Sequence, residues 1–115
     1  RKNFFLNFGL DTKIFEETSI NVRNGFSFLK EKKIDKIDLL KIDTEGHEYF
    51  VIKGFGDNID KVKVIFFEHH YDQMIMKDYT FSDIHHYLKL KGFKPYSKFK
   101  MPFRKSFEYI YVNKN

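Results

Sequence analysis

The chain has 115 residues, a formal net charge of +5, 42% hydrophobic residues and no cysteine. These values fit one globular unit with a single hydrophobic core, so we treat residues 1–115 as one domain. The lack of cysteine excludes disulfides and thiolate metal sites and favours a cytoplasmic location. No stretch approaches the roughly 18 apolar residues that a membrane-spanning helix needs.

The positive charge gives little support to nucleic-acid binding. Lysines are spread along the chain, and acidic residues interrupt the one dense basic cluster, residues 30–36. We interpret that cluster as a solvated helix end. The 15 Phe and 7 Tyr residues could stack on bases. No RNA-recognition signature accompanies them, so we assign them to the core and do not expect a nucleic-acid partner.

Strands and helices alternate in the first part of the chain. Residues 3–10 are rich in aromatic side chains and predict a strand. Residues 18–23 are a second, short strand candidate. Residues 24–34 predict a helix that Asn24 caps. The apolar residues within 36–42 predict a buried strand.

The middle of the chain continues the alternation. Residues 47–55 predict a short helix that ends at Gly54, a residue type that tolerates a left-handed cap. Residues 61–70 predict another strand. Four consecutive apolar residues, 64–67, indicate that this strand is covered on both faces.

The last part predicts one helix followed by two strands. Residues 80–93 have an apolar stripe at helical spacing, and Thr80 and Asp83 resemble a capping box. Residues 94–99 and 106–113 read as an antiparallel pair. Together the elements predict an α/β fold with a mainly parallel sheet that ends in this pair.

Polar residues follow two neighbouring strands of the predicted sheet. In sheets of this class, ligands bind beyond the carboxyl ends of the strands. One cluster lies after residues 36–42 and the other at the end of 61–70, so we expect both to face one crevice. The clusters are Asp43, Glu45 and Gly46 in the first, and Glu68, His69 and His70 in the second.

The first cluster has two interpretations. Asp43 and Glu45 can accept hydrogen bonds from a ligand hydroxyl or ammonium group, or bind a metal. A carboxylate here can instead cap the following helix, as Thr44 also can. Two acids are more than one cap needs, and both interpretations stay open. Gly46 permits either a turn with positive φ or the close approach of a ligand.

The second cluster could form a metal site or a general-base pair. A zinc site has little support, because no H-E-x-x-H motif is present and adjacent residues on a strand point to opposite faces. We therefore assign no metal. The alternative is that these are polar residues where a strand leaves the core. We favour a functional role for Glu68 and none for His70.

The segment "IDLLKIDTEGHEYFVIKGF", followed by "VKVIFFEHH", resembles the FkbM-type family of S-adenosylmethionine-dependent methyltransferases. The family pattern is roughly D-L-L-K-I-D-x-E-G-x-E, then an apolar helix with K/R-G, then a strand that ends in Glu. The similarity runs from about Ser19 to the C-terminus. The matching residues are Asp38, Lys41, Asp43, Glu45, Gly46, Glu48, Lys53, Gly54 and Glu68.

This resemblance implies a Rossmann-like methyltransferase sheet. Residues 37–42 and 62–68 would be its fourth and fifth strands, and the tail pair its antiparallel sixth and seventh. The implied reaction moves a methyl group from S-adenosylmethionine to a hydroxyl of a sugar or natural product. The implied site has Asp43, Glu45 and Gly46 binding cofactor or substrate, and Glu68, His69 and His47 as catalytic residues, with His47 or His69 taking the proton.

One part of the family pattern is missing. The sequence shows neither the glycine-rich turn after the first strand nor the acid that ends the second. Because the chain also begins at Arg1 and not at Met, we expect it to be the C-terminal portion of a methyltransferase. It would then pair with an N-terminal half or form a homo-oligomer. The alternative is a non-catalytic remnant that acts as an assembly or binding module.

The missing half also leaves an edge to be covered. The strand at 37–42 would normally pair with the first strand of the cofactor-binding half. We expect residues 4–8, a second copy of the chain or an upstream segment to cover that edge, since open strand edges recruit other strands.

Overall fold

The computed structural model describes residues 16–115. The predicted strand at 3–10 therefore lies outside the described residues. No helix in the described part has the length and apolar character needed to cross a bilayer. The elements in chain order are α2 (Gly25–Lys32), β1 (Ile37–Ile42), α3 (Glu48–Lys53), the 3-10 helix η2 (Gly56–Lys61), β2 (Val62–His70), α4 (Phe81–Leu90), β3 (Phe93–Lys100) and β4 (Ser106–Asn113).

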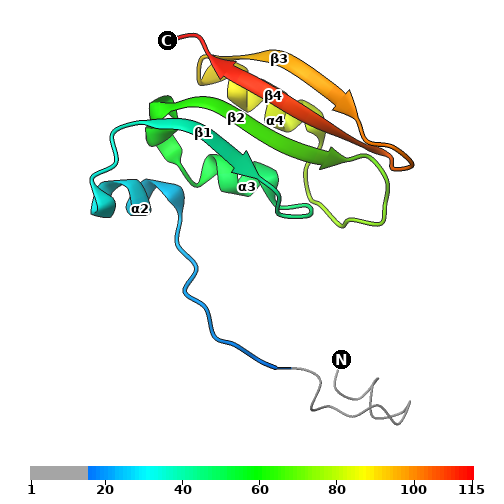
Figure 1. Cartoon of the computed structure of the whole chain (residues 1–115), viewed down its shortest axis with the longest axis horizontal. Helices are drawn as coiled ribbons and strands as arrows, with labels where there is room; N and C mark the ends of the chain where they lie inside the picture. The colour runs from blue at the N-terminus through cyan, green and yellow to red at the C-terminus, as the bar shows by residue number, and fades with distance from the viewer. Residues whose placement is uncertain (1–15) are drawn as a thin grey trace.

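The four strands form one sheet in the order β1-β2-β4-β3 (Figure 1). β1 and β2 are parallel, whereas β4 pairs antiparallel with both β2 and β3. The α/β class and the antiparallel tail pair are thus confirmed. The expectation of a mainly parallel sheet is wrong for the described strands, because the last strand returns between β2 and β3 and adds two antiparallel pairings.

Helix α2 forms where its capping signal predicts. The Asn24 side chain accepts a hydrogen bond from the backbone N–H of Ser27 at 2.8 Å. Leu29 is the helix's buried residue, and the helix ends at Lys33 in a left-handed conformation with φ of 53°. A local capping rule therefore places this helix correctly, one residue after its predicted start.

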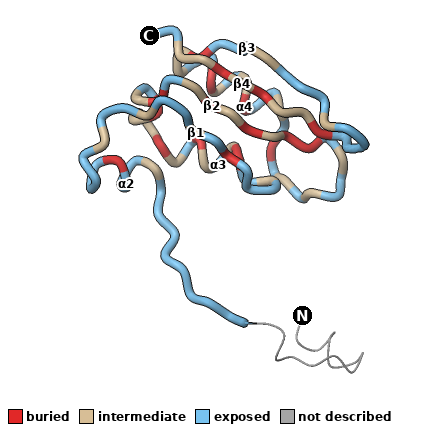
Figure 2. Tube along the Cα trace, viewed as in Figure 1, coloured by how far each residue is buried: buried red, intermediate tan, exposed pale blue. Residues whose placement is uncertain are grey.

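The strand predicted at 18–23 is wrong. This segment has no regular structure and is exposed throughout, and Figure 2 shows it running away from the sheet. Ile20 is 78% exposed and Val22 is 88% exposed. β-branched residues favour a strand only where a neighbouring strand supplies hydrogen bonds and packing, and the described residues offer none here.

The sheet is covered less completely than the sequence predicts. Along β2, Ile65 and Phe67 are fully buried. Val64 and Phe66, which point to the opposite face, are partly exposed. Helix α4 lies behind the sheet in the view of Figure 1 and contributes to the same core cluster as the buried β2 residues. The described helices therefore cover one face of β2, and coverage on both faces is not observed.

β1 also departs from the prediction of a buried strand. It is an edge strand, paired only with β2 among the described residues. Ile42 is buried, but Leu39 is 57% exposed. An apolar sequence run therefore identified the strand but not its place at the edge of the sheet.

Two helix ends test the capping predictions. Thr80 and Asp83 form both bonds of a capping box at the start of α4, as predicted. Gly54 ends α3 with φ of −64°, which is right-handed, so the left-handed cap expected there is wrong. The positive φ occurs two residues later, at Gly56, where the chain turns into η2.

Candidate functional site

The connection between β1 and α3 is built around the buried side chain of Glu48. Its Oε1 accepts hydrogen bonds from the Thr44 backbone N–H at 3.3 Å, the Thr44 hydroxyl at 3.0 Å and the Gly46 N–H at 3.1 Å. Its Oε2 accepts one from the Tyr79 hydroxyl at 2.5 Å. Glu48 is only 2% exposed, so one anchored carboxylate fixes the whole connection.

The protonation of this carboxylate follows from its surroundings. Burial is the largest single influence and opposes ionisation. The hydrogen bonds from Tyr79, the Gly46 backbone and Thr44 outweigh it and lower the pKa of Glu48. Burial and the bond to Glu48 in turn raise the pKa of the Tyr79 hydroxyl. Glu48 therefore stays ionised and Tyr79 stays a hydrogen-bond donor. From the sequence, Glu48 was only a motif match, and its structural role was missed.

Glu45 and Gly46 both have positive φ, at 52° and 104°. Of the two interpretations given for Gly46, a turn with positive φ is thus observed. A Cβ at Gly46 would lie 2.5 Å from Cγ2 of Ile75 and 3.0 Å from the backbone oxygen of Met76. Close approach is also present, but the approaching group is the chain's own segment after β2. The left-handed conformation of Glu45 turns its carboxylate toward the end of β2.

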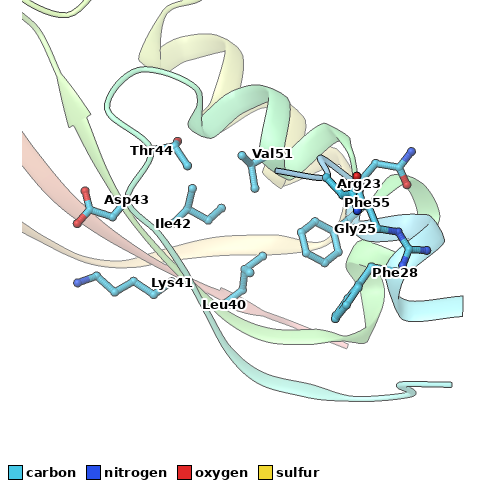
Figure 3. A pocket seen from close by; sticks show the side chains of 12 residues that line it. Arg23, Gly25, Phe28, Leu40, Lys41, Ile42, Asp43, Thr44, Val51 and Phe55 are labelled. Atoms are coloured by element: carbon cyan, nitrogen blue, oxygen red, sulfur yellow. The ribbon is translucent and has the colours of Figure 1, made fainter. Parts of the chain in front are cut away.

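Asp43 does not cap α3. The N-cap residue is His47, which makes no side-chain capping bond. The Asp43 side chain is exposed and has no hydrogen bond or ion pair among the described residues. In Figure 3 it points to the same side as Lys41, away from Val51. The capping interpretation therefore finds no support at Asp43, which leaves its carboxylate available.

An open pocket of about 760 Å³ lies beside the free edge of β1 (Figure 3). The end of β1, the start of α2 and helix α3 line it. Phe28 and Phe55 give it an apolar side, and its charged lining residues are Arg23, Lys41 and Asp43. Arg23 is already paired with Glu31. The pocket thus combines an apolar wall with Lys41 and the unpaired carboxylate of Asp43, whose side chains both point away from Val51 (Figure 3).

A second group of polar atoms converges where β1 and β2 end. His70 Nε2 lies 3.4 Å from Glu45 Oε2 and 3.6 Å from Glu68 Oε1. One potential ligand atom from each residue lies within 4.8 Å of the others. Ser106 donates a hydrogen bond to Glu68 Oε1 at 2.7 Å. We call these three residues the Glu45–Glu68–His70 cluster.

The cluster joins two predicted residues and one that the sequence did not favour. Glu45 and Glu68 follow neighbouring parallel strands, and the structure brings them together. His70 lies two residues after Glu68, so the strand's alternation puts both on one face. This two-residue spacing between Glu68 and His70 is the sequence signal that could have identified His70 as a member of the site. Asp43 does not belong to the cluster.

The two predicted proton acceptors lie outside the cluster. His69 points to the other face of β2, where it is 2% exposed and contacts the rings of Tyr71 and Tyr79. Burial, with the charge of Lys77, lowers the pKa of His69 to about 4. Its Nδ1 has no hydrogen-bond partner in the part of the chain that the structure describes. His47 is exposed at the start of α3, beside the ring of Phe50.

Comparison with known protein families gives a match. The family model described as Methyltransferase FkbM domain matches residues 2–95. The match begins earlier than the similarity expected from about residue 19, and it ends before β4. None of the curated proteins and none of the solved structures compared matches the chain. Because the family model covers most of the sequence and includes both polar clusters, the chain belongs to the FkbM methyltransferase family.

Proposed function

We propose that the chain takes part in methyl transfer from S-adenosylmethionine to a hydroxyl of a sugar or natural product. The main support for this proposal is the position of Glu45 and Glu68. Both residues lie in the matched family region, and they come together at the carboxyl ends of two parallel strands. Ligands of α/β sheets bind at such ends. We assign β1 and β2 as the fourth and fifth strands of a Rossmann-like methyltransferase sheet, and β3 and β4 as its antiparallel sixth and seventh.

The pocket beside β1 fits part of such a cofactor. Its volume lies in the range of small-molecule sites, and its apolar wall suits a purine ring. Asp43 offers an unpaired carboxylate that would accept hydrogen bonds from ribose hydroxyls or from the ammonium group. When bound, S-adenosylmethionine supplies an electrophilic methyl group on a sulfonium. A further chain segment or a second copy would complete the binding site.

The protein's own residues would align the acceptor and receive its proton. Alignment of the acceptor oxygen with the methyl group accelerates the reaction most where both groups are held rigidly. Glu48 supplies that rigidity to the loop that carries Glu45. The Glu68 side chain is only 12% exposed and accepts a hydrogen bond from Ser106. Both features support Glu68 as the group that would accept the hydroxyl proton as the new carbon–oxygen bond forms.

Calorimetric titration of the protein with S-adenosylmethionine tests this proposal. We expect measurable but weak binding. Asp43→Asn should weaken it about tenfold or more, the usual effect of losing a hydrogen bond to a charged group. Asp38→Asn is the matched control, because Asp38 is exposed on the same strand and does not line the pocket. No binding, or equal losses in both variants, would contradict the proposal.

A second candidate function is an assembly or binding module without catalysis. One edge of β1 has no partner strand among residues 16–115, and an exposed apolar strand edge can pair with another chain, which favours this function. A protein that forms stable dimers and shows no affinity for S-adenosylmethionine would support this function over the first.

A further inference from the structure

His70 is in an unusual environment for a histidine. It is only 7% exposed, yet its side chain makes no hydrogen bond with any described residue. Its Nε2 instead faces two carboxylates, from Glu45 and Glu68. The ring nitrogen thus points at two carboxylate oxygens and makes a hydrogen bond with neither of them. This arrangement is consistent with a partner shared by the three side chains.

The distances indicate what that partner is. A charged hydrogen bond from imidazole to carboxylate would be about 2.7–2.9 Å long. The observed separations are 3.4 Å and 3.6 Å. Donors that share a metal ion, each about 2.0–2.2 Å from it, lie roughly 2.8–3.6 Å apart in tetrahedral or octahedral geometry. The two separations from His70 thus exceed those of direct charged hydrogen bonds and match those of ligands around one ion. The third pair, Glu45 and Glu68, lies within 4.8 Å.

The supporting contacts are also those of a metal site. Ser106 donates to Glu68 Oε1 and so orients that carboxylate, as outer residues commonly do for metal ligands. The Glu45 side chain is 57% exposed, which leaves the outer side of the cluster open to solvent. One imidazole and two carboxylates give three protein ligands and leave positions for water or substrate.

We propose that Glu45, Glu68 and His70 bind a divalent transition-metal ion such as Zn²⁺ or Mn²⁺. An imidazole ligand favours these ions over Mg²⁺ and Ca²⁺, which take mostly oxygen ligands. This assignment differs from our expectation from the sequence, which included no metal. That expectation considered adjacent strand positions and overlooked Glu68 and His70, which are two residues apart and share a face.

The ion's role in catalysis rests on the proposed function, whereas its binding does not. An ion in this position would polarise the acceptor hydroxyl and lower its pKa. The oxygen–hydrogen bond would break with the proton passing to water, because Glu68 would be a ligand of the ion. The oxygen would form its bond to the methyl carbon while the carbon–sulfur bond breaks. S-adenosylmethionine is the methyl donor in that step.

Titration with Co²⁺, followed by visible absorption, and calorimetry with Zn²⁺, Mn²⁺ and Mg²⁺ test the site directly. We expect one ion per chain and at least tenfold weaker binding of Mg²⁺. Glu45→Gln and Glu68→Gln should each weaken transition-metal binding by tenfold or more. Glu45 is exposed, so its variant is expected to fold normally, and circular dichroism verifies this.

The matched control is Asp35→Asn. Asp35 is exposed just before β1, at the opposite end of that strand from Glu45, and it does not belong to the cluster. The substitution changes the charge equally, and binding should stay within about twofold of the unmodified protein. Absence of stoichiometric binding, or equal binding by Glu45→Gln and Asp35→Asn, would overturn the site. Preference for Mg²⁺ would overturn the ion class.

The metal site and the proposed function can fail separately. Metal titrations are made without S-adenosylmethionine, and cofactor titrations are repeated with a chelator present. Ion binding without cofactor affinity would retain the site and contradict methyl transfer. Cofactor affinity without ion binding would retain the function and overturn the site.

Discussion

Replacing Gly46 with Ala should destabilise the protein strongly. Gly46 has φ of 104°, a conformation that L-residues rarely adopt, and forcing a side chain into positive φ costs about 1–2 kcal/mol. The added Cβ would also lie 2.5 Å from Cγ2 of Ile75 and 3.0 Å from the backbone oxygen of Met76. Relieving such overpacking typically costs a further 1–3 kcal/mol.

Together these two effects amount to about 2–5 kcal/mol. A domain of this size has a total stability of about 5–15 kcal/mol, and 1 kcal/mol shifts its Tm by about 4–8 °C. We therefore expect Gly46→Ala to lower the Tm by about 10 °C or more, measured by circular dichroism or calorimetry. The hydrogen bond from Gly46 N–H to Glu48 should weaken at the same time.

Gly54→Ala is the matched control. Gly54 has an ordinary helical φ of −64°, and its added Cβ would meet the nearest atom at 3.2 Å. The Tm should therefore change by only a few degrees. A Gly46→Ala protein as stable as Gly54→Ala would refute our account of the connection between β1 and α3.

Three further predictions concern single residues and one edge. Stability should fall as pH decreases from about 6.5 toward about 4. In this range the unfolded chain binds a proton at His69, whereas the folded chain, in which the pKa of His69 is lowered to about 4, does not. His69→Phe should flatten that part of a plot of Tm against pH, and an unchanged slope would contradict the assigned pKa. Asp43→Asn should reduce methyl transfer far more than Tm, and the reverse result would show that Asp43 is structural. If a second copy or residues 4–8 cover β1, amide hydrogen exchange should be slow at Leu39 to Ile42. Light scattering would then distinguish a dimer from a monomer. A monomer whose amides exchange rapidly there would show that the edge is bare.

Local signals in the sequence predicted local structure well. Asn24 caps α2, and Thr80 with Asp83 caps α4, because a capping bond involves residues only three positions apart. Gly46 adopts the positive φ that was one of its two interpretations from the sequence. The alternation of residues 106–113 predicted β4, since a strand with two different faces carries its period in its own sequence.

Features that depend on distant residues were missed. The strand at 18–23 failed because no described strand lies beside it, and β1 is exposed because it is an edge. Glu48 became recognisable as an anchor only when the fold placed Tyr79 against it. His70 gains its significance from Glu45, which reaches it through the left-handed backbone of the connection after β1.

The sequence predicted only part of the candidate site. The motif located Glu45, Gly46 and Glu68, and the pairing of β1 with β2 brings the two acids together as parallel neighbours should be. His69, predicted as a catalytic residue, is instead buried on the opposite face of β2, and its low pKa depends on side chains that only the fold supplies.

The central claim is that the carboxyl ends of β1 and β2 form a methyltransferase site. Backbone amide NMR spectra recorded during titration with S-adenosylmethionine test it most directly, because they detect weak binding and locate it. We expect the resonances of residues 43–46 to shift progressively, with those of residues 68–70, while those of β3 stay in place. No shifts at saturating cofactor, or shifts confined to β3, would contradict the claim.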